Sequence, residues 1–98
     1  MDVFVTREEY RFVWDSDKAA SNFLKHGISF DRAIEVFFDP LHELVDASVD
    51  DEIRQAAIGL DFHRHVLFVV NLVMEGDTIR IISARLATRG ELKIYENA

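Results

Sequence analysis

Arginine and tyrosine side chains near the end of the chain are the first residues whose types and spacing suggest chemistry. Arg80 and Arg85 lie in the apolar segment 79–85, and Tyr95 follows ten residues after Arg85. A guanidinium group offers a rigid fork of N–H donors that fits the oxygens of a phosphate. If these groups meet at one end of a sheet, they are suited to holding and cleaving a phosphodiester.

Strand geometry sets a condition on that arrangement. Successive side chains of a strand alternate between its faces, so Arg80 and Arg85 fall on opposite faces unless the strand twists or contains a bulge. A structural alternative for Arg80 is an ion pair with Asp77 or another carboxylate, because an arginine in an apolar strand needs a partner.

A second polar group precedes the predicted sheet. Lys18, Asn22, Lys25 and His26 follow one another at spacings of four, three and one, which places them on one side of a helix. Such a stripe is either a solvated surface or a face that contacts nucleic acid, with His26 as a group that titrates near neutral pH. Arg89, in the predicted last helix, is a further candidate for such contacts.

Metal and thiol chemistry find little support. The sequence has no cysteine and four histidines, so a disulfide framework is excluded. His63 and His65 are separated by one residue, but the four-ligand spacing of a zinc site is missing. We therefore predict no metal and no cofactor.

The charge is unevenly distributed along the chain. The formal net charge is −7, which has the wrong sign for binding phosphates. Residues 39–61 carry seven acids and only Arg54 as a base, whereas residues 78–98 carry four bases and two acids. The acidic middle is either a solvated loop or a surface for a basic partner.

Helix signals dominate the first half of the chain. Weak alternation predicts a strand at 10–14. Ser16 as N-cap and Gly27 after the last turn predict a helix over 17–26, with a buried stripe of Ala19, Ala20, Phe23 and Leu24. Ser29 caps a second helix that ends at Pro40, so the two helices form a hairpin.

Strand signals dominate the second half. We predict strands at 44–46, 53–60, 65–73 and 78–85, a turn at 75–77, and a last helix to Glu96 that opens with the capping-box pair Thr88 and Glu91. The order indicates an α+β fold with an antiparallel meander, an N-terminal helical hairpin and a C-terminal helix. The chain forms one domain, 1–98, in which residues 1–9 are an N-terminal extension.

Location follows from hydropathy. The stretch 1–10 is charged and unlike a signal peptide. The longest apolar run, 66–70, is far shorter than the ~20 residues that span a bilayer. We expect a cytoplasmic protein that does not enter a membrane.

Two motifs, in this order and spacing, resemble the BrnT family of bacterial toxins. The first is Lys25-His26-Gly27-Ile28-Ser29-Phe30, and the second is Arg80-Ile81-Ile82-Ser83-Ala84-Arg85. The resemblance extends from about Tyr10 to Glu96.

The resemblance implies a RelE-like fold and the toxin role in a type II toxin–antitoxin system. It implies a metal-independent endoribonuclease that inhibits translation. Its partner would be a BrnA-like ribbon-helix-helix antitoxin, and operator DNA would be bound only through that antitoxin. We accordingly predict catalytic residues Arg80, Arg85, Tyr95 and His26, and RNA-binding residues Lys18, Asn22, Lys25 and Arg89.

The chain departs from the family's pattern at several places. Residues 61–65 replace a basic stretch, residues 72–75 make an apolar turn, and the last helix has fewer arginines. These departures keep a second hypothesis open, in which the protein is a degenerate toxin that acts as a protein-binding module in an operon-repressing complex.

Overall fold

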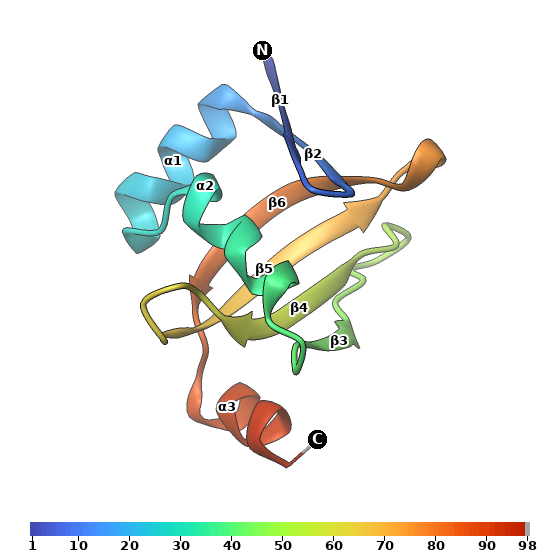
Figure 1. The fold of residues 1–98 in the computed structure, drawn as a ribbon. Helices are drawn as coiled ribbons and strands as arrows, with labels where there is room; N and C mark the ends of the chain where they lie inside the picture. The colour runs from blue at the N-terminus through green and yellow to red at the C-terminus, as the bar shows by residue number, and fades with distance from the viewer. Residues whose placement is uncertain (98) are drawn as a thin grey trace.

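Six strands form one sheet in the order β1-β2-β6-β5-β4-β3. The computed structural model describes residues 1–97. The strands are β1 (Asp2–Arg7), β2 (Tyr10–Asp15), β3 (Glu43–Asp46), β4 (Gln55–Leu60), β5 (Val66–Val73) and β6 (Thr78–Leu86). β3 to β6 form an antiparallel meander, but β2 lies parallel to β6. The sheet is therefore mixed rather than antiparallel throughout, since α1 connects β2 to the later strands (Figure 1).

Within the expected N-terminal extension, residues 2–7 form the first strand of this sheet. β1 pairs with β2 over its whole length, from Asp2 opposite Asp15 to Arg7 opposite Tyr10. Val3 and Val5 pack against the core, whereas Phe4 points to the other face and is 74% exposed.

Helix α1 (Ser16–His26) has the predicted extent but a different cap and a different buried side. The carboxylate of Asp15, rather than Ser16, accepts the N–H of Lys18, and Gly27 ends the helix with φ 72°. Of the predicted buried stripe, Ala19 packs against the core, but Ala20, Phe23 and Leu24 are exposed, and Asn22 is the buried residue of the helix.

The second predicted helix forms only one α-helical turn. Ser29 caps α2 (Phe30–Ala33), and the chain then tightens into the 3₁₀ helix η1 (Ile34–Phe38) before Pro40. Phe30, Ala33, Ile34 and Phe37 of this segment are nevertheless buried, because a tightened turn still directs them toward the sheet.

The core lies between one face of the sheet and the segment α2–η1 (Figure 1). Phe12 and Trp14 of β2 contact Phe37 and Phe30, with ring centroids 5.5 and 5.9 Å apart. Gly59 permits η1 to approach β4: a Cβ there would lie 3.1 Å from the carbonyl oxygen of Val36.

The segment α2–η1 covers only one face of the sheet. We call the opposite face the open face, and we define it by Phe68, Leu72, Arg80, Ile82 and Arg85. The turn η2 (Glu75–Asp77) connects β5 to β6, and Gly76 adopts φ 78° in it. Helix α3 (Arg89–Glu96) begins with the predicted capping box. Among residues 1–97, no helix is both long enough and apolar enough to cross a membrane.

Candidate functional site on the open face

A bulge in β6 places the two predicted arginines on the same face of the sheet. Val70 pairs with Ser83 and Asn71 with Ile81, so Ile82 has no partner in β5. The inward positions are therefore Ile79, Ile81 and then Ala84. An extra residue in one strand shifts the alternation by one, and this shift brings Arg85 to the side of Arg80.

Arg80 lies in a groove that it shares with the first turn of α1. The groove has a volume of about 460 Å³ and is lined by Lys18, Asp51, Glu52, Ile53, Arg54, Leu72, Arg80 and Ile82. Arg80 donates to Asp2 at 2.8 Å, and Arg54 pairs with Glu52. The structure thus brings Lys18 and Arg80 together and adds Arg54, and it pairs the two arginines with carboxylates at the molecular surface.

Arg85 lies farther along β6 and has different neighbours. Its two terminal nitrogens donate to Glu91 of α3 at 2.7 and 2.9 Å. The guanidinium carbon lies 4.4 Å from the ring centroid of Phe68. Hydrogen bonding to Glu91 raises the pKa of Arg85 and lowers the pKa of Glu91. Five strand positions, about 16 Å in a regular strand, separate Arg80 from Arg85, and their side chains pair with different carboxylates.

The polar stripe of α1 follows β6 from one arginine toward the other. Lys18 lines the groove with Ile82, and Asn22 bonds to Ala84, so the helix and the strand run in the same direction. His26 lies one turn after Asn22 on the same side of the helix and is partly buried. Lys25 and Arg89 are exposed at the ends of their helices.

Asn22 is an internal connector of the fold. Its Nδ2 donates to the carbonyl oxygens of Ile28 and Ala84, and its Oδ1 accepts the N–H of Ala84. The side chain is only 7% exposed. The side-chain amide of Asn22 therefore holds α1 against β6 and does not face solvent.

Tyr95 makes its contact away from the groove of Arg80. Its hydroxyl donates to Asp39 Oδ2 at 2.6 Å, and the same oxygen accepts the N–H of Leu60. Burial, with the bond to Asp39, raises the pKa of Tyr95 to about 12. The phenol therefore keeps its proton near neutral pH and holds α3 against the end of η1.

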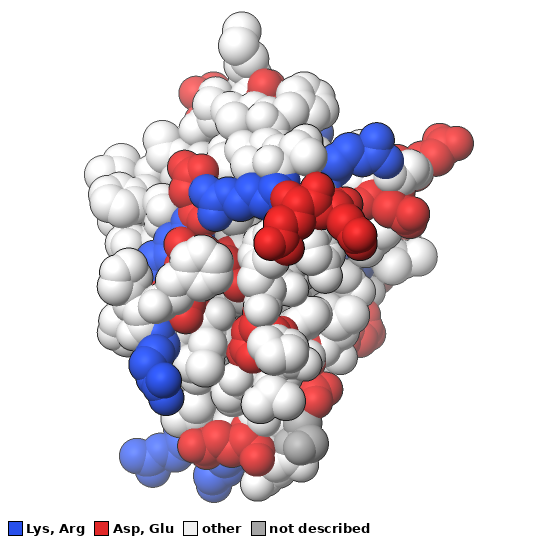
Figure 2. Space-filling view, viewed as in Figure 1, with Lys and Arg blue, Asp and Glu red and all other residues white. Residues whose placement is uncertain are grey.

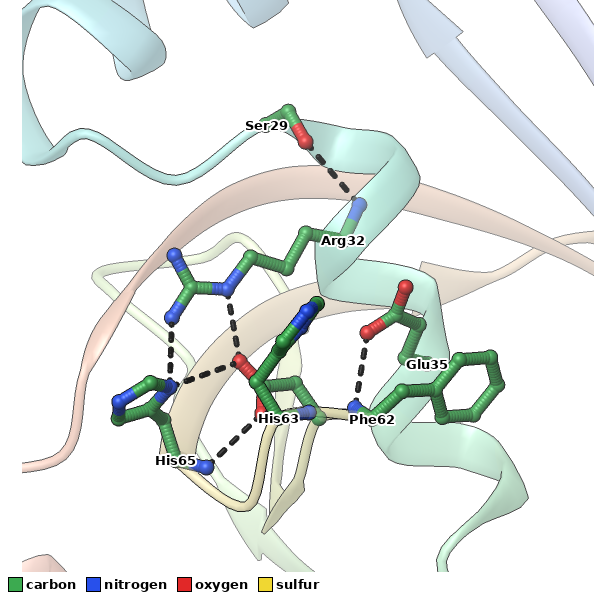
Figure 3. A network of polar contacts seen from close by, with 7 residues as sticks. Ser29, Arg32, Glu35, Phe62, His63 and His65 are labelled. Atoms are coloured by element: carbon green, nitrogen blue, oxygen red, sulfur yellow. Dashed lines mark hydrogen bonds and ion pairs between the residues drawn. The ribbon is translucent and has the colours of Figure 1, made fainter.

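A further polar cluster, which sequence reasoning missed, joins α2 to the turn between β4 and β5 (Figure 3). The buried carboxylate of Asp61 accepts Arg32 Nε at 2.7 Å and the backbone N–H groups of His63 and His65. Glu35 accepts the N–H of Phe62. Arg32 and Asp61 lie 29 positions apart in sequence, and Glu35 and Phe62 lie 27 apart, so no local pattern shows their contact.

This cluster includes the residues best able to approach a cation. Ligand atoms of Glu35, Asp61 and His63 lie within 4.8 Å of one another. However, the guanidinium of Arg32 already balances the charge of Asp61, and backbone amides occupy its other oxygen. We assign the cluster to fixing the turn between β4 and β5.

Charge does not favour the helix-bearing face as a nucleic-acid surface. Figure 2 shows that acidic groups spread over its centre and right-hand side, while the basic groups lie apart from one another. The open face holds the predicted cations of β6 together with apolar and aromatic side chains that suit contact with bases.

Comparison with known proteins agrees with the motifs in the sequence. Residues 14–91 match the model of a family described as the ribonuclease toxin BrnT of type II toxin–antitoxin systems. The crystal structure of the Brucella abortus ribonuclease toxin BrnT is similar to this chain, with a TM-score of 0.63 and 26% sequence identity. That alignment covers 78% of this chain and 94% of the Brucella chain. A comparison with curated proteins found no match.

Proposed function

Because this chain belongs to the BrnT family of ribonuclease toxins of type II toxin–antitoxin systems, we propose that it is an endoribonuclease that cuts RNA on the open face of its sheet and so inhibits translation. The observation that carries this proposal is the bulge at Ile82. It gives Arg80 and Arg85 a common face, alongside the stripe of Lys18 and His26 on α1.

The proposed reaction needs charge stabilisation at phosphorus. The 2′-oxygen of RNA attacks the adjacent phosphorus, the 5′-oxygen leaves, and negative charge develops on the phosphoryl oxygens in between. Arg80, in the groove with Lys18, would stabilise that charge, and such a donor typically contributes about 10²–10³ in rate. Arg85 would hold a neighbouring part of the same strand, with Phe68 offering an aromatic surface.

Proton transfer needs a side chain that can remove the 2′-OH proton and supply one to the leaving 5′-oxygen. His26 is the histidine on the side of α1 that faces β6, and we propose it as the acid–base group. Lys18, Lys25 and Arg89 would contact the RNA backbone. Asn22 and Tyr95 would act by positioning α1 and α3, since their polar atoms are engaged within the fold.

Further properties follow from the family resemblance. We propose a RelE-like relationship for the fold, a reaction that needs no metal ion, and a cytoplasmic location. The antitoxin that family membership implies would be a BrnA-like ribbon-helix-helix protein, and operator DNA would be bound through it.

Arg80→Ala tests the site. The substitution removes one of the three cations that line the groove, the one proposed to stabilise the charge at phosphorus, so we expect cleavage of a purified RNA in EDTA to fall about 100-fold or more. The pair of Arg80 with Asp2 is partly exposed, so stability should change by less than about 1 kcal/mol. Arg7→Ala removes the same charge from β1 and serves as the matched control. Equal cleavage by both variants would refute the assignment.

A second candidate function is a non-catalytic binding module. The specific observation in its favour is that Arg80 and Arg54 are already paired with Asp2 and Glu52 in a chain of net charge −7. If the wild-type chain cleaves no RNA at any pH from 5 to 9, with or without a divalent cation, this second function is the correct one.

A further inference from the structure

Apolar side chains are exposed around a groove at the β3 edge of the sheet. The groove has a volume of about 420 Å³, and its lining includes Leu44, Val45, Ile53, Leu72 and Val73. Leu44 is 52% exposed, Val73 51% and Ile53 80%. Clustered exposure of this kind on a small protein marks a surface that another molecule covers.

Acidic groups surround this apolar groove. Asp46 lines it directly. On the adjoining loop and turn, the exposed acids are Asp50, Asp51, Glu52, Glu75 and Asp77. Of the bases near these acids, Arg54 is paired with Glu52, and Arg11 donates to the carbonyl oxygen of Gly76 in the turn. The surface therefore complements a partner that presents apolar side chains flanked by lysine or arginine.

The apolar groove adjoins the groove that holds Arg80. Ile53, Arg54 and Leu72 line both of them. β3 is also the last strand of the sheet, with four residues and one unpaired edge. A chain seated on Leu44 and Val73 would therefore extend across Ile53 toward Lys18 and Arg80.

We propose that the antitoxin neutralises this protein by docking a basic amphipathic segment in the apolar groove, from which it covers the adjoining groove of Arg80. The docking part stands on the exposed apolar residues and their acidic rim. The neutralisation part rests on the proposed function, because it requires the Arg80 groove to be the RNA site.

A second copy of this chain is a poorer occupant. Two identical acidic rims would meet across such an interface, and like charges brought together oppose association. The oligomeric state of the free chain is therefore one outcome of the test.

The test uses a double variant, Leu44→Lys with Val73→Lys. Both residues line only the apolar groove, and both are half exposed, so the fold should tolerate the change. The probe is the antitoxin encoded in the same operon as this chain. We expect its affinity for the variant to fall roughly 100-fold, as for substitutions of central interface residues. RNA cleavage by the variant alone should equal that of wild type, and its toxicity should persist when the antitoxin is co-expressed.

Two controls separate the possible failures. Leu24→Lys introduces the same change at an 87% exposed leucine of α1 and should bind the antitoxin like wild type. Arg80→Ala should lose cleavage but keep antitoxin binding, so a failure of the proposed function is recognised independently. Leu44→Ser with Val73→Ser, which adds no charge, replaces the lysine variant if thermal unfolding shows that variant to be destabilised.

Three results would overturn the proposal. The first is unchanged antitoxin affinity of the double variant. The second is a loss of affinity in Leu24→Lys instead. The third is a wild-type chain that is dimeric by light scattering and becomes monomeric in the double variant, which would show that a second copy occupies the groove.

Discussion

At the scale of single residues, the proton of Tyr95 decides what that residue can do. A phenol whose pKa is about 12 donates a hydrogen bond at neutral pH but does not accept a proton from RNA. Asp39, in turn, accepts from Tyr95, Leu41 and Leu60, so the pair joins α3 to the segment after η1. The catalytic role predicted from sequence is thereby replaced, in our proposal, by a positioning role.

Tyr95→Phe tests that role. The ring remains and one hydrogen bond to a carboxylate is lost, so we expect the free energy of unfolding to fall by about 1–2 kcal/mol. Cleavage per folded molecule should stay within about twofold of wild type, with an unchanged pH profile. Urea denaturation and initial cleavage rates measure the two quantities. A loss of cleavage at unchanged stability would return Tyr95 to the catalytic group.

The type of a residue predicted the chemical kind of partner that it needs, but not which residue supplies that partner. The need of Arg80 for a carboxylate followed from its apolar strand, yet the partner is Asp2, 78 positions away and brought near by the β1–β2 hairpin. Arg54 was visible in the sequence as the only base among seven acids. Its place beside Arg80 depends on the pairing of β3 to β6, which composition does not encode.

At the scale of elements, the sequence predicted helix caps from nearby residues correctly, but it did not predict features that depend on pairing between distant strands. The cap at Ser29, the capping box of Thr88 and Glu91, and the left-handed Gly27 all depend on neighbours within four residues. The bulge at Ile82 depends on the register with β5. The parallel contact of β2 with β6 depends on how α1 leads the chain away, so alternation alone predicted neither feature.

The buried side of α1 was predicted incorrectly for a physical reason. Hydrophobic periodicity favoured Phe23 and Leu24, but the helix turns the side-chain amide of Asn22 toward β6. This amide bonds to the backbone N–H and carbonyl oxygen of Ala84. Ala84 lies beyond Thr78 to Arg80, the residues of β6 that pair with β2. Backbone hydrogen bonds that would otherwise be orphaned cost more than exposed apolar area at these positions.

Asn22→Ala tests this explanation. The substitution leaves the carbonyls of Ile28 and Ala84 and one N–H without partners in a buried position, so we expect a loss of about 3 kcal/mol in unfolding free energy. Ser21→Ala, at the adjacent exposed position, should change it by less than about 0.5 kcal/mol. Urea denaturation compares the two variants. A loss below 1 kcal/mol for Asn22→Ala would contradict the connector role.

At the scale of the whole molecule, the excess of acids has two separate consequences. A net charge of −7 opposes long-range attraction of RNA, so the proposed RNA contacts must act at short range, on the open face. The same acids also hold the fold together. Burial raises the pKa of Asp61, but hydrogen bonds from His65 and Arg32 lower it by more, and Asp39 behaves in the same way through Leu60 and Tyr95.

Acid should therefore destabilise this protein steeply. A carboxyl whose pKa is lower in the folded chain stabilises the fold above its unfolded pKa of about 4, and that contribution is lost as pH falls through the folded pKa. We expect the free energy of unfolding to decline from about pH 5 downward. Urea denaturation at pH 7, 4 and 3 measures it, and Asp61→Asn should show a shallower decline from a lower starting value. Equal stability at pH 7 and 3 would exclude this contribution.

The parallel contact between β2 and β6 also has a consequence for synthesis. β2 is made early, but the strand that it pairs with begins at Thr78, so the N-terminal hairpin cannot take its place in the sheet until residues 78–80 have been made. Contacts so distant in sequence form slowly. The groove between Lys18 and Arg80 therefore forms late in folding, because one of its walls comes from β6 and the other from α1.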